Sequence, residues 1–439
     1  MKREKMSVCP YCFGEISREN IAYWIRKEDN ERPFEDRAYQ LCNEREQGED
    51  RRFRDFWSNK DLDVAGMARR RIVLTRQEIR ELLQNGVRTS SYSDMDAQEE
   101  DLERFFLYDG ILPVAEAIPV CENCHNVLRE DYFSVPTFHI AMYAPKATGK
   151  TSFLCGLNHE SVMSYGNMKH LVFGHEMTFE YLREEEPFYQ EFFSQMHSYE
   201  EGKDTIGSAN IRNMPMSCLV QNQGHVVRLF FHDVSGELLS KRGGVNEIRV
   251  MISKMDALML LMEATKEDTK VDDGLWQSYL DKCRILSAEE QMYAEREEGQ
   301  GCRVEDLLPQ KVQSRKSMLR DMVYQKLLNE DILKRKQRSQ IPVAVFITKG
   351  DRLDQKYQTE IKEPCQEPKD LVKKQRKAKQ LFMEYDEQMG LFCESFGEQC
   401  YGVLSAYGRE PGEKPMPWGI RESMVSLVQV LKRHYDFVG

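Results

Sequence analysis

The chain of 439 residues has no long apolar run and no excess of positive charge. No stretch approaches the roughly 18 apolar residues that a membrane-spanning helix needs. The first five residues, Met1–Lys5, are not followed by the apolar core of a secretory signal. The formal net charge of −11 argues against a general nucleic-acid binder. We therefore expect a soluble, cytoplasmic protein without a membrane partner.

The sequence also lacks the residue patterns of several enzyme classes. Its nine histidines form no evident pair, and no Ser/His/Asp order or cluster of acids stands out, so a nuclease or protease is not supported. Eight of the twelve cysteines are scattered without pattern, which does not indicate a disulfide framework.

The other four cysteines form two Cys-x-x-Cys pairs, at Cys9, Cys12, Cys121 and Cys124. Each such turn points two thiolates at one cation, and two turns complete a tetrahedral Zn²⁺ site. We predict that these four residues bind zinc. Two alternatives stay open: His125 could replace one of the cysteines, and the pairs could be redox-active, although the βαβ setting of a thioredoxin-like motif is missing.

A chain of this length is expected to contain two or three folding units. We predict a small zinc ribbon that is split between residues 1–16 and 117–135 and interrupted by an α-rich insertion over residues 17–116. Residues 136–439 form the third part. It carries a helical insertion over about residues 266–340, because nearly eighty residues separate two of its strands.

From residue 136 the pattern changes to apolar strands separated by polar helices, which is typical of an α/β fold. We expect a mainly parallel sheet with helices on both faces. Its strands are predicted at residues 138–143, 226–231, 257–262, 341–347 and 401–404, with an edge strand at 216–220. Within the helical insertion, residues 311–338 are basic; a solvated helix face and a nucleic-acid surface both stay open.

The string Ala144-Pro-Lys-Ala-Thr-Gly149-Lys150-Thr151 follows the first of these strands. A loop there points backbone N–H groups and a helix N-terminus at one anion. Lys150 is predicted to reach the β- and γ-phosphates, and the Thr151 hydroxyl to bind Mg²⁺. Ala144 stands where this motif usually has glycine. The predicted nucleotide contacts of this loop are Lys146, Ala147, Thr148, Gly149, Lys150, Thr151 and Ser152.

The string Asp233-Val-Ser-Gly236 follows the second strand. A carboxylate at a strand end is costly unless it is paired or linked to a metal, and in P-loop NTPases it holds Mg²⁺. Gly236 lets its N–H approach the γ-phosphate closely. Thr205 is predicted to complete the metal shell, with Ser208 as the alternative.

Two further strings are predicted to bind a guanine base: Thr348-Lys349-Gly-Asp351 and Ser405-Ala406. The Asp351 carboxylate can accept hydrogen bonds from the ring N–H and the exocyclic amine of guanine, a donor pair that adenine lacks. Lys349 would lay its aliphatic stem over the ring, and Thr348 stands where Asn is more common. Ser405 and Ala406 would offer a backbone N–H to the guanine carbonyl oxygen.

Together these strings resemble the Ras-like, translation-factor-related class of P-loop GTPases, over roughly residues 136–439. Asp233–Glu237, the approach to Thr205 and the closing Pro417-Trp418-Gly are most similar to the double-GTPase families of prokaryotic conflict systems. The resemblance implies a P-loop NTPase fold and a GTP-hydrolysing switch that cycles between GTP and GDP with Mg²⁺. It also implies work through a partner or effector protein, or through self-association, in a defence system.

Lys150, Thr205 and Glu237 are the catalytic residues that the resemblance implies. Glu237 stands where the class usually has the Gln that orients the attacking water, so we expect slow intrinsic hydrolysis that a partner stimulates. Lys146 could supply part of the stabilising charge from within the phosphate loop.

Two other functions stay open. If Thr348–Asp351 is coincidental, the chain is a P-loop ATPase or a kinase, and a preference for ATP would distinguish it. The departures from the usual motifs at Ala144 and Glu237 leave a further hypothesis, a nucleotide-binding scaffold with little turnover.

Overall fold

The structure is a computed structural model. It describes residues 7–26, 49–59, 63–69, 71–75, 77–78, 116–129, 131–144, 148–165, 175–179, 189–202, 215–222, 225–234, 253–263, 340–353, 355–363, 365–385, 387–408 and 414–435. The predicted helical insertion at about residues 266–340, with its basic segment 311–338, lies outside the described residues apart from its last position.

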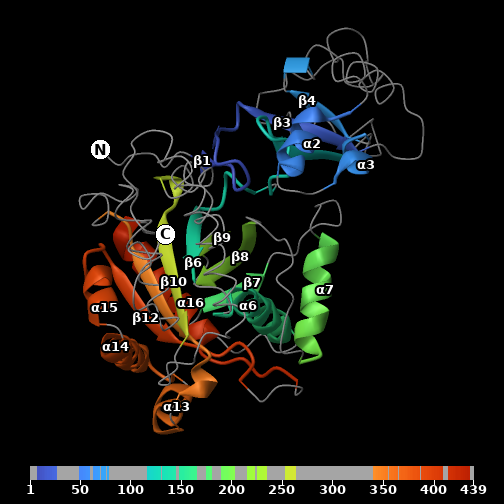
Figure 1. The fold of residues 1–439 in the computed structure, drawn as a ribbon. Coiled ribbons are helices and arrows are strands. Elements are labelled where there is room, and N and C mark those ends of the chain that lie inside the picture. Colours follow the sequence, from blue (N-terminus) through green and yellow to red (C-terminus); the bar gives the residue numbers. More distant parts are fainter. Residues whose placement is uncertain are drawn as a thin grey trace, which may run out of the picture. The chain divides into compact units, whose positions relative to one another are not determined.

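Seven strands of the described chain form one sheet. They are β6 (Thr137–Tyr143), β7 (His175–Phe179), β8 (Pro215–Asn222), β9 (His225–Val234), β10 (Ala257–Glu263), β11 (Val343–Thr348) and β12 (Gln399–Val403). Their order across the sheet is β12-β11-β10-β6-β9-β8-β7 (Figure 1). β10 pairs with β11 and β11 with β12 in parallel, whereas β8 and β9 are antiparallel. The predicted α/β class with a largely parallel sheet is confirmed.

The five runs predicted as sheet strands each overlap a strand, although residues 341–342 and 404 fall outside β11 and β12. Continuous apolar runs are typical of parallel strands that are covered on both faces. Every residue of β10 and β11 is buried. The prediction that residues 216–220 form an edge strand is wrong, since β8 lies between β9 and β7. β7 is only five residues long and contains a histidine and a glutamate, so it has no continuous apolar run and was not predicted as a strand.

Helices follow the strands. They are α6 (Lys150–Tyr165) after β6, then α13 (Gln355–Lys362), α14 (Pro368–Tyr385), α15 (Glu387–Glu394) and α16 (Ile420–Tyr435). Successive side chains of a strand point to opposite faces. In β12 the Tyr401 ring lies 6.0 Å from Phe382 of α14, whereas a Cβ added at Gly402 would meet Ser423 of α16. Helices α14 and α16 therefore cover opposite faces of the sheet at β12, and α16 also packs on α6.

The amino-terminal part has its own small sheets. β1 (Ser7–Val8) pairs with β2 (Glu15–Ile16), and a three-stranded antiparallel sheet has the order β4 (Ile72–Thr75), β3 (Ile21–Arg26), β5 (Glu116–Cys121). Two short helices, α2 (Arg51–Ser58) and α3 (Ala65–Ala68), accompany it. Among the residues described between 17 and 116, strands and helices are thus mixed; the α-rich character of the whole insertion stays a prediction. Ile21 to Trp24 are buried in this sheet, whose apolar core the high charge of the surrounding sequence concealed.

Contacts divide the chain into two compact units. One comprises Met1–Ile140, Glu176–Ser198 and Gly207–Asp233; the other comprises Ala141–His175, Tyr199–Ile206 and Val234–Gly439. The first unit contains all but the final residues of the helix α7 (Tyr189–Glu200). None of the described helices has the length and apolar character that crossing a membrane requires.

Candidate functional site

The predicted nucleotide-binding strings lie at the carboxyl ends of neighbouring strands. Glu263 at the end of β10 is in register with Thr348 at the end of β11, and Ile347 is in register with Val403 at the end of β12. The strand order reverses at β6, whose neighbours are β10 on one side and β9 on the other. Ligands of open α/β sheets bind outside the carboxyl ends of strands at such a point. The loop between β6 and α6 begins there.

A hydrogen bond links the end of this loop to the first base-reading string. The Thr348 hydroxyl donates to the Thr148 carbonyl oxygen over 2.7 Å and lies 3.2 Å from the Met262 carbonyl oxygen. Thr148 and Thr348 are both buried. The hydroxyl of Thr348 therefore ties three segments together.

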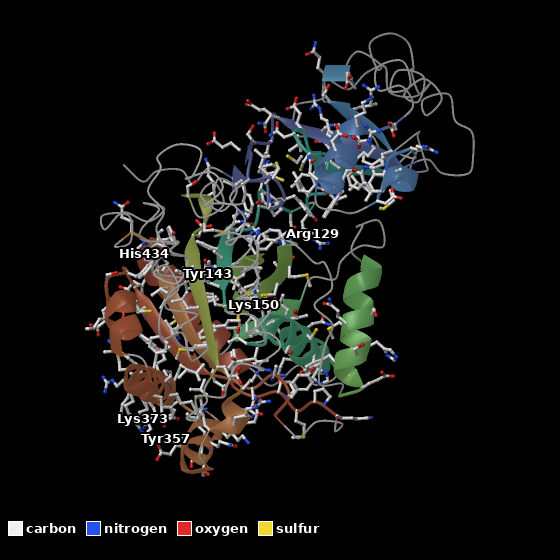
Figure 2. The ribbon with its side chains drawn as sticks, viewed as in Figure 1. Arg129, Tyr143, Lys150, Tyr357, Lys373 and His434 are labelled. Carbon is white, nitrogen blue, oxygen red and sulfur yellow. The ribbon has the colours of Figure 1, made fainter. Side chains whose placement is uncertain are left out.

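Gly149 begins α6 with a left-handed backbone, at φ +94°. Its carbonyl oxygen accepts the first helical hydrogen bond, from Phe153 N at 2.8 Å. The N–H groups of the first helical turn have no acceptor within a helix, so Lys150, Thr151 and Ser152 present an anion-attracting end. Lys150 is labelled in Figure 2, with Tyr143 at the end of β6.

Ala144 fits the loop without left-handed strain. Its backbone is not among those with positive φ, and the residue is buried. The departure from glycine at this position therefore costs nothing in backbone conformation. Lys146 and Ala147 lie outside the described residues.

The two predicted base-reading strings are in contact. The Ser405 hydroxyl donates to Asp351 Oδ1 and accepts from the Gly408 N–H over 2.9 Å. Gly350 N donates to the Leu404 carbonyl oxygen over 2.9 Å. Ser405 is fully buried and Asp351 is half-buried. Ser405 therefore orients the carboxylate that was predicted to select the base.

Glycine is required at position 350. A Cβ there would lie 2.5 Å from Trp418 Cη2 and 2.9 Å from a Val403 methyl carbon. Trp418 and Ser405 exchange backbone hydrogen bonds of 3.0 Å in both directions. Trp418 thus packs against both predicted base-reading strings.

Glu263 is a functional candidate that the sequence reasoning missed. Its side chain is 3% exposed, and its Oε1 lies 2.9 Å from Lys349 Nζ and 3.1 Å from Arg352 Nη1. Lys349 itself has a left-handed backbone at φ 54°. The signal was present, since Glu263 directly follows the six apolar residues 257–262, just as Asp233 follows an apolar strand. The carboxylate therefore fixes Lys349, a residue of the predicted base-reading string.

Tyr199, at the end of α7, contacts the second base-reading string. Its hydroxyl donates to the Ala406 carbonyl oxygen, and its ring lies 5.1 Å from the Tyr407 ring. Burial raises the pKa of Tyr199 well above its usual value, so the hydroxyl keeps the proton that it donates. The 207 positions between the two residues leave no signal in the sequence.

The remaining predicted site residues are those expected to bind Mg²⁺ and the γ-phosphate. Thr205, Ser208, Gly236 and Glu237 lie outside the described residues. Asp233 belongs to strand β9, and its backbone alone is described. The magnesium shell and the hydrolytic role of Glu237 stay predictions.

The four paired cysteines form one cluster, as predicted. Their Sγ atoms all lie within 4.8 Å of one another, with Cys9 3.7 Å from Cys124 and Cys12 3.8 Å from Cys121. Three are buried and Cys12 is half-buried. Four thiolates at such distances can hold one metal ion.

The two cysteine turns have the same backbone geometry. Cys9 N donates to Gly14 O and Phe13 N to Cys9 O; in the second turn Cys121 N donates to Asn126 O and His125 N to Cys121 O. The residue after the second cysteine is left-handed in both, with φ 57° at Phe13 and 54° at His125. We call these turns the first and the second knuckle.

His125 is engaged outside the cluster. Its Nδ1 lies 2.7 Å from Asp50 Oδ1, and Arg71 donates to Asp50 Oδ2 and to the His125 carbonyl oxygen. The Arg71 guanidinium lies over the rings of Trp24 and Phe53, 4.2 and 4.0 Å from their centroids. Burial raises the pKa of Asp50, but His125 and Arg71 outweigh burial and hold the pKa below its usual value. This buried network orients the second knuckle, and the four cysteines converge without His125.

No protein-family model matches the chain, and no curated protein is significantly similar to it.

Proposed function

We propose that the chain is a GTP-binding and GTP-hydrolysing P-loop switch that works with Mg²⁺ and acts through partner proteins in a prokaryotic defence system. The observation that carries the proposal is the hydrogen bond from Thr348 to the Thr148 carbonyl. It brings the end of the predicted phosphate loop against the predicted base-reading string, although the two lie 200 positions apart.

At the phosphate end, α6 offers the N–H groups of its first turn to an anion. Lys150 supplies a cation for the β- and γ-phosphates, and the Thr151 hydroxyl ligates Mg²⁺. Asp233 and Thr205 complete the metal shell in this proposal, with Gly236 against the γ-phosphate.

At the base end, Asp351 accepts the two donors of guanine. Ser405 fixes one carboxylate oxygen of Asp351, which reduces the entropy lost when the base binds. Tyr199 holds the carbonyl group of Ala406, the residue whose N–H faces the guanine oxygen in this proposal.

Hydrolysis is slow in isolation because Glu237 adds negative charge where the class usually has Gln. A partner or a second copy supplies the missing positive charge, which is worth about 10³–10⁵ in rate when an arginine does so. Within the chain itself, Lys146 is the candidate for supplying this positive charge. Turnover that Lys146→Ala leaves unchanged would exclude this residue.

The four-cysteine cluster binds zinc as a structural site in this proposal. A closed set of four thiolates leaves no open position for substrate, which is typical of structural rather than catalytic zinc. The role in a defence system is supported only by the resemblance of Asp233–Glu237, the approach to Thr205 and Pro417–Gly419.

Calorimetric titration of the full chain with non-hydrolysable GTP and ATP analogues in Mg²⁺ tests the function. We expect GTP-analogue binding that Asp351→Asn weakens by about tenfold or more, because the carboxylate accepts two hydrogen bonds. The matched control is Asp370→Asn, a change of the same kind at the start of α14, where asparagine also accepts from backbone N–H groups.

Each other result has a definite meaning. Binding of the ATP analogue that Asp351→Asn leaves intact would replace the GTPase by an ATPase. Tight GTP binding without turnover, even with the partner present, would favour a nucleotide-binding scaffold. If neither the GTP analogue nor the ATP analogue binds, the proposed nucleotide site is rejected.

A further inference from the structure

The first knuckle contacts the strand that carries the predicted magnesium ligand. The Phe13 ring lies 5.1 Å from the His232 ring, at an interplanar angle of 54°. His232 is fully buried in β9 and directly precedes Asp233. Phe13 reaches this position from a left-handed backbone that the knuckle imposes.

A hydrogen-bonded path joins the same knuckle to His232 from a second direction. The Tyr132 hydroxyl donates to the carbonyl oxygen of Val8, the residue before Cys9, over 2.5 Å. It also lies 3.3 Å from His139 Nε2, and His139 Nδ1 lies 3.0 Å from His232 Nε2. His232 is therefore in contact with Phe13 of the first knuckle and is linked through His139 and Tyr132 to Val8, the residue before that knuckle.

We propose that metal loading of the four-cysteine cluster positions β9 at His232 and thereby sets the Mg²⁺ requirement of nucleotide binding. This inference rests on the proposed function, in which Asp233 is a magnesium ligand. Phe13 is a positioning residue, because it acts on the site through His232 and the backbone of β9.

The physical basis is the backbone of Phe13. A left-handed conformation is unfavourable for a residue with a side chain. A metal ion bound to Cys9 and Cys12 holds the turn and offsets that cost. When the metal leaves, the turn relaxes to a negative φ, the ring withdraws from His232, and β9 loses a fixed point.

The second knuckle provides a matched comparison. His125 has the same left-handed position as Phe13, but its ring contacts Asp50. Glycine accepts this backbone conformation without strain, so Phe13→Gly and His125→Gly each delete a ring while keeping the turn that ligates the metal.

The experiment uses the full chain and measures three quantities for the wild type and both variants. They are zinc per chain, amide hydrogen exchange of residues 225–234 without nucleotide, and the Mg²⁺ concentration that gives half-maximal binding of a GTP analogue. We expect both variants to retain zinc. Phe13→Gly alone should raise exchange in β9 and raise the Mg²⁺ half-saturation about fivefold or more, as for a coupling between two sites.

The results separate the two proposals. Unchanged exchange and unchanged Mg²⁺ half-saturation in zinc-loaded Phe13→Gly would overturn the inference, as would equal shifts in both variants. Raised exchange with an unchanged Mg²⁺ half-saturation would overturn the link to the magnesium site. If the wild type binds no guanine nucleotide, the proposed function fails, whereas raised exchange in Phe13→Gly alone would still support the coupling of the knuckle to β9.

Discussion

Single residues at the strand ends do more than their short motifs predict. Ser405 and Ala406 were predicted to contribute a backbone N–H, but the N–H of Ser405 donates to the Trp418 carbonyl oxygen, and the buried Ser405 hydroxyl bridges Asp351 and the Gly408 backbone. Such a role cannot be read from the sequence, because it depends on which loop lies opposite. Tyr199 was missed for the same reason. Glu263, by contrast, could have been predicted, since a carboxylate directly after an apolar strand needs a charged partner.

Ser405→Ala removes both hydrogen bonds of the Ser405 hydroxyl. We expect a loss of about 1–3 kcal/mol in the free energy of unfolding, because buried polar partners are left unsatisfied. Guanine-nucleotide affinity should also fall. Ser426→Ala is the control: its buried hydroxyl donates to Glu422 O and accepts from Gln375, remote from the base-reading strings. Urea unfolding and calorimetry check both variants; equal affinities would exclude the orienting role of Ser405.

Asp50→Asn breaks the buried contacts with Arg71 and His125. At pH 7 we expect a loss of about 3–5 kcal/mol, because an uncompensated guanidinium stays buried. The folded-state pKa of Asp50 lies below its usual value, so the carboxylate stabilises the fold above its unfolded-state pKa and stops doing so as the pH falls through the folded-state pKa. The difference between wild type and variant should therefore shrink below about pH 4.

Urea titrations from pH 7 to pH 3 measure this difference. Asp55→Asn is the control on the same helix, with a side chain that is 63% exposed. Its effect should stay within about 0.5 kcal/mol. A wild-type advantage over Asp50→Asn that is constant across the whole range would contradict the lowered pKa.

At the scale of elements, apolar periodicity predicted the buried strands and failed for those that are short or polar. Residues 257–262 of β10 and 343–347 of β11 are continuous apolar runs, whereas the five-residue strand β7 contains a histidine, a glutamate and a threonine. The sequence also did not predict how the edge strand β12 is protected. Lys374 and Gln375 of α14 contact Glu422 and Ser426 of α16, and unpaired strand edges are usually protected in such ways.

Gly149→Ala tests the junction of β6 and α6. With φ at +94°, an alanine is strained although its Cβ has space, and we expect a loss of about 1–2 kcal/mol. Gly66→Ala is the matched control within helix α3, where a Cβ would meet nothing within 4 Å. It should be neutral or stabilise by up to about 1 kcal/mol. Chemical denaturation gives both values, and equal changes would contradict a special conformation at Gly149.

At the scale of the whole molecule, the sequence identified the two cysteine pairs as one site although Cys12 and Cys121 are 109 positions apart. The inference succeeded because a tetrahedral site needs four ligands and each pair supplies two. Domain boundaries were harder to predict. β5 runs through the expected boundary at residues 116 and 117, because one strand serves both the knuckle and the three-stranded sheet.

Metal analysis of the purified chain should give one zinc ion per chain. Cys121→Ser should abolish tight binding, since three thiolates and a hydroxyl form a weaker site. Cys365→Ser is the control, a half-buried cysteine outside the cluster that should leave the zinc content unchanged. Full zinc content in Cys121→Ser would contradict the four-thiolate site.

The separation of the knuckles also determines when a metal ion could bind to all four cysteines during biosynthesis. At about 5–20 residues per second, a ribosome adds the 109 positions between Cys12 and Cys121 roughly 5–25 s after the first knuckle. Throughout that interval the nascent chain carries two thiols without their partner ligands. A four-thiolate metal site could therefore form only after residue 124 has been added, when most of the 439-residue chain is still to be made.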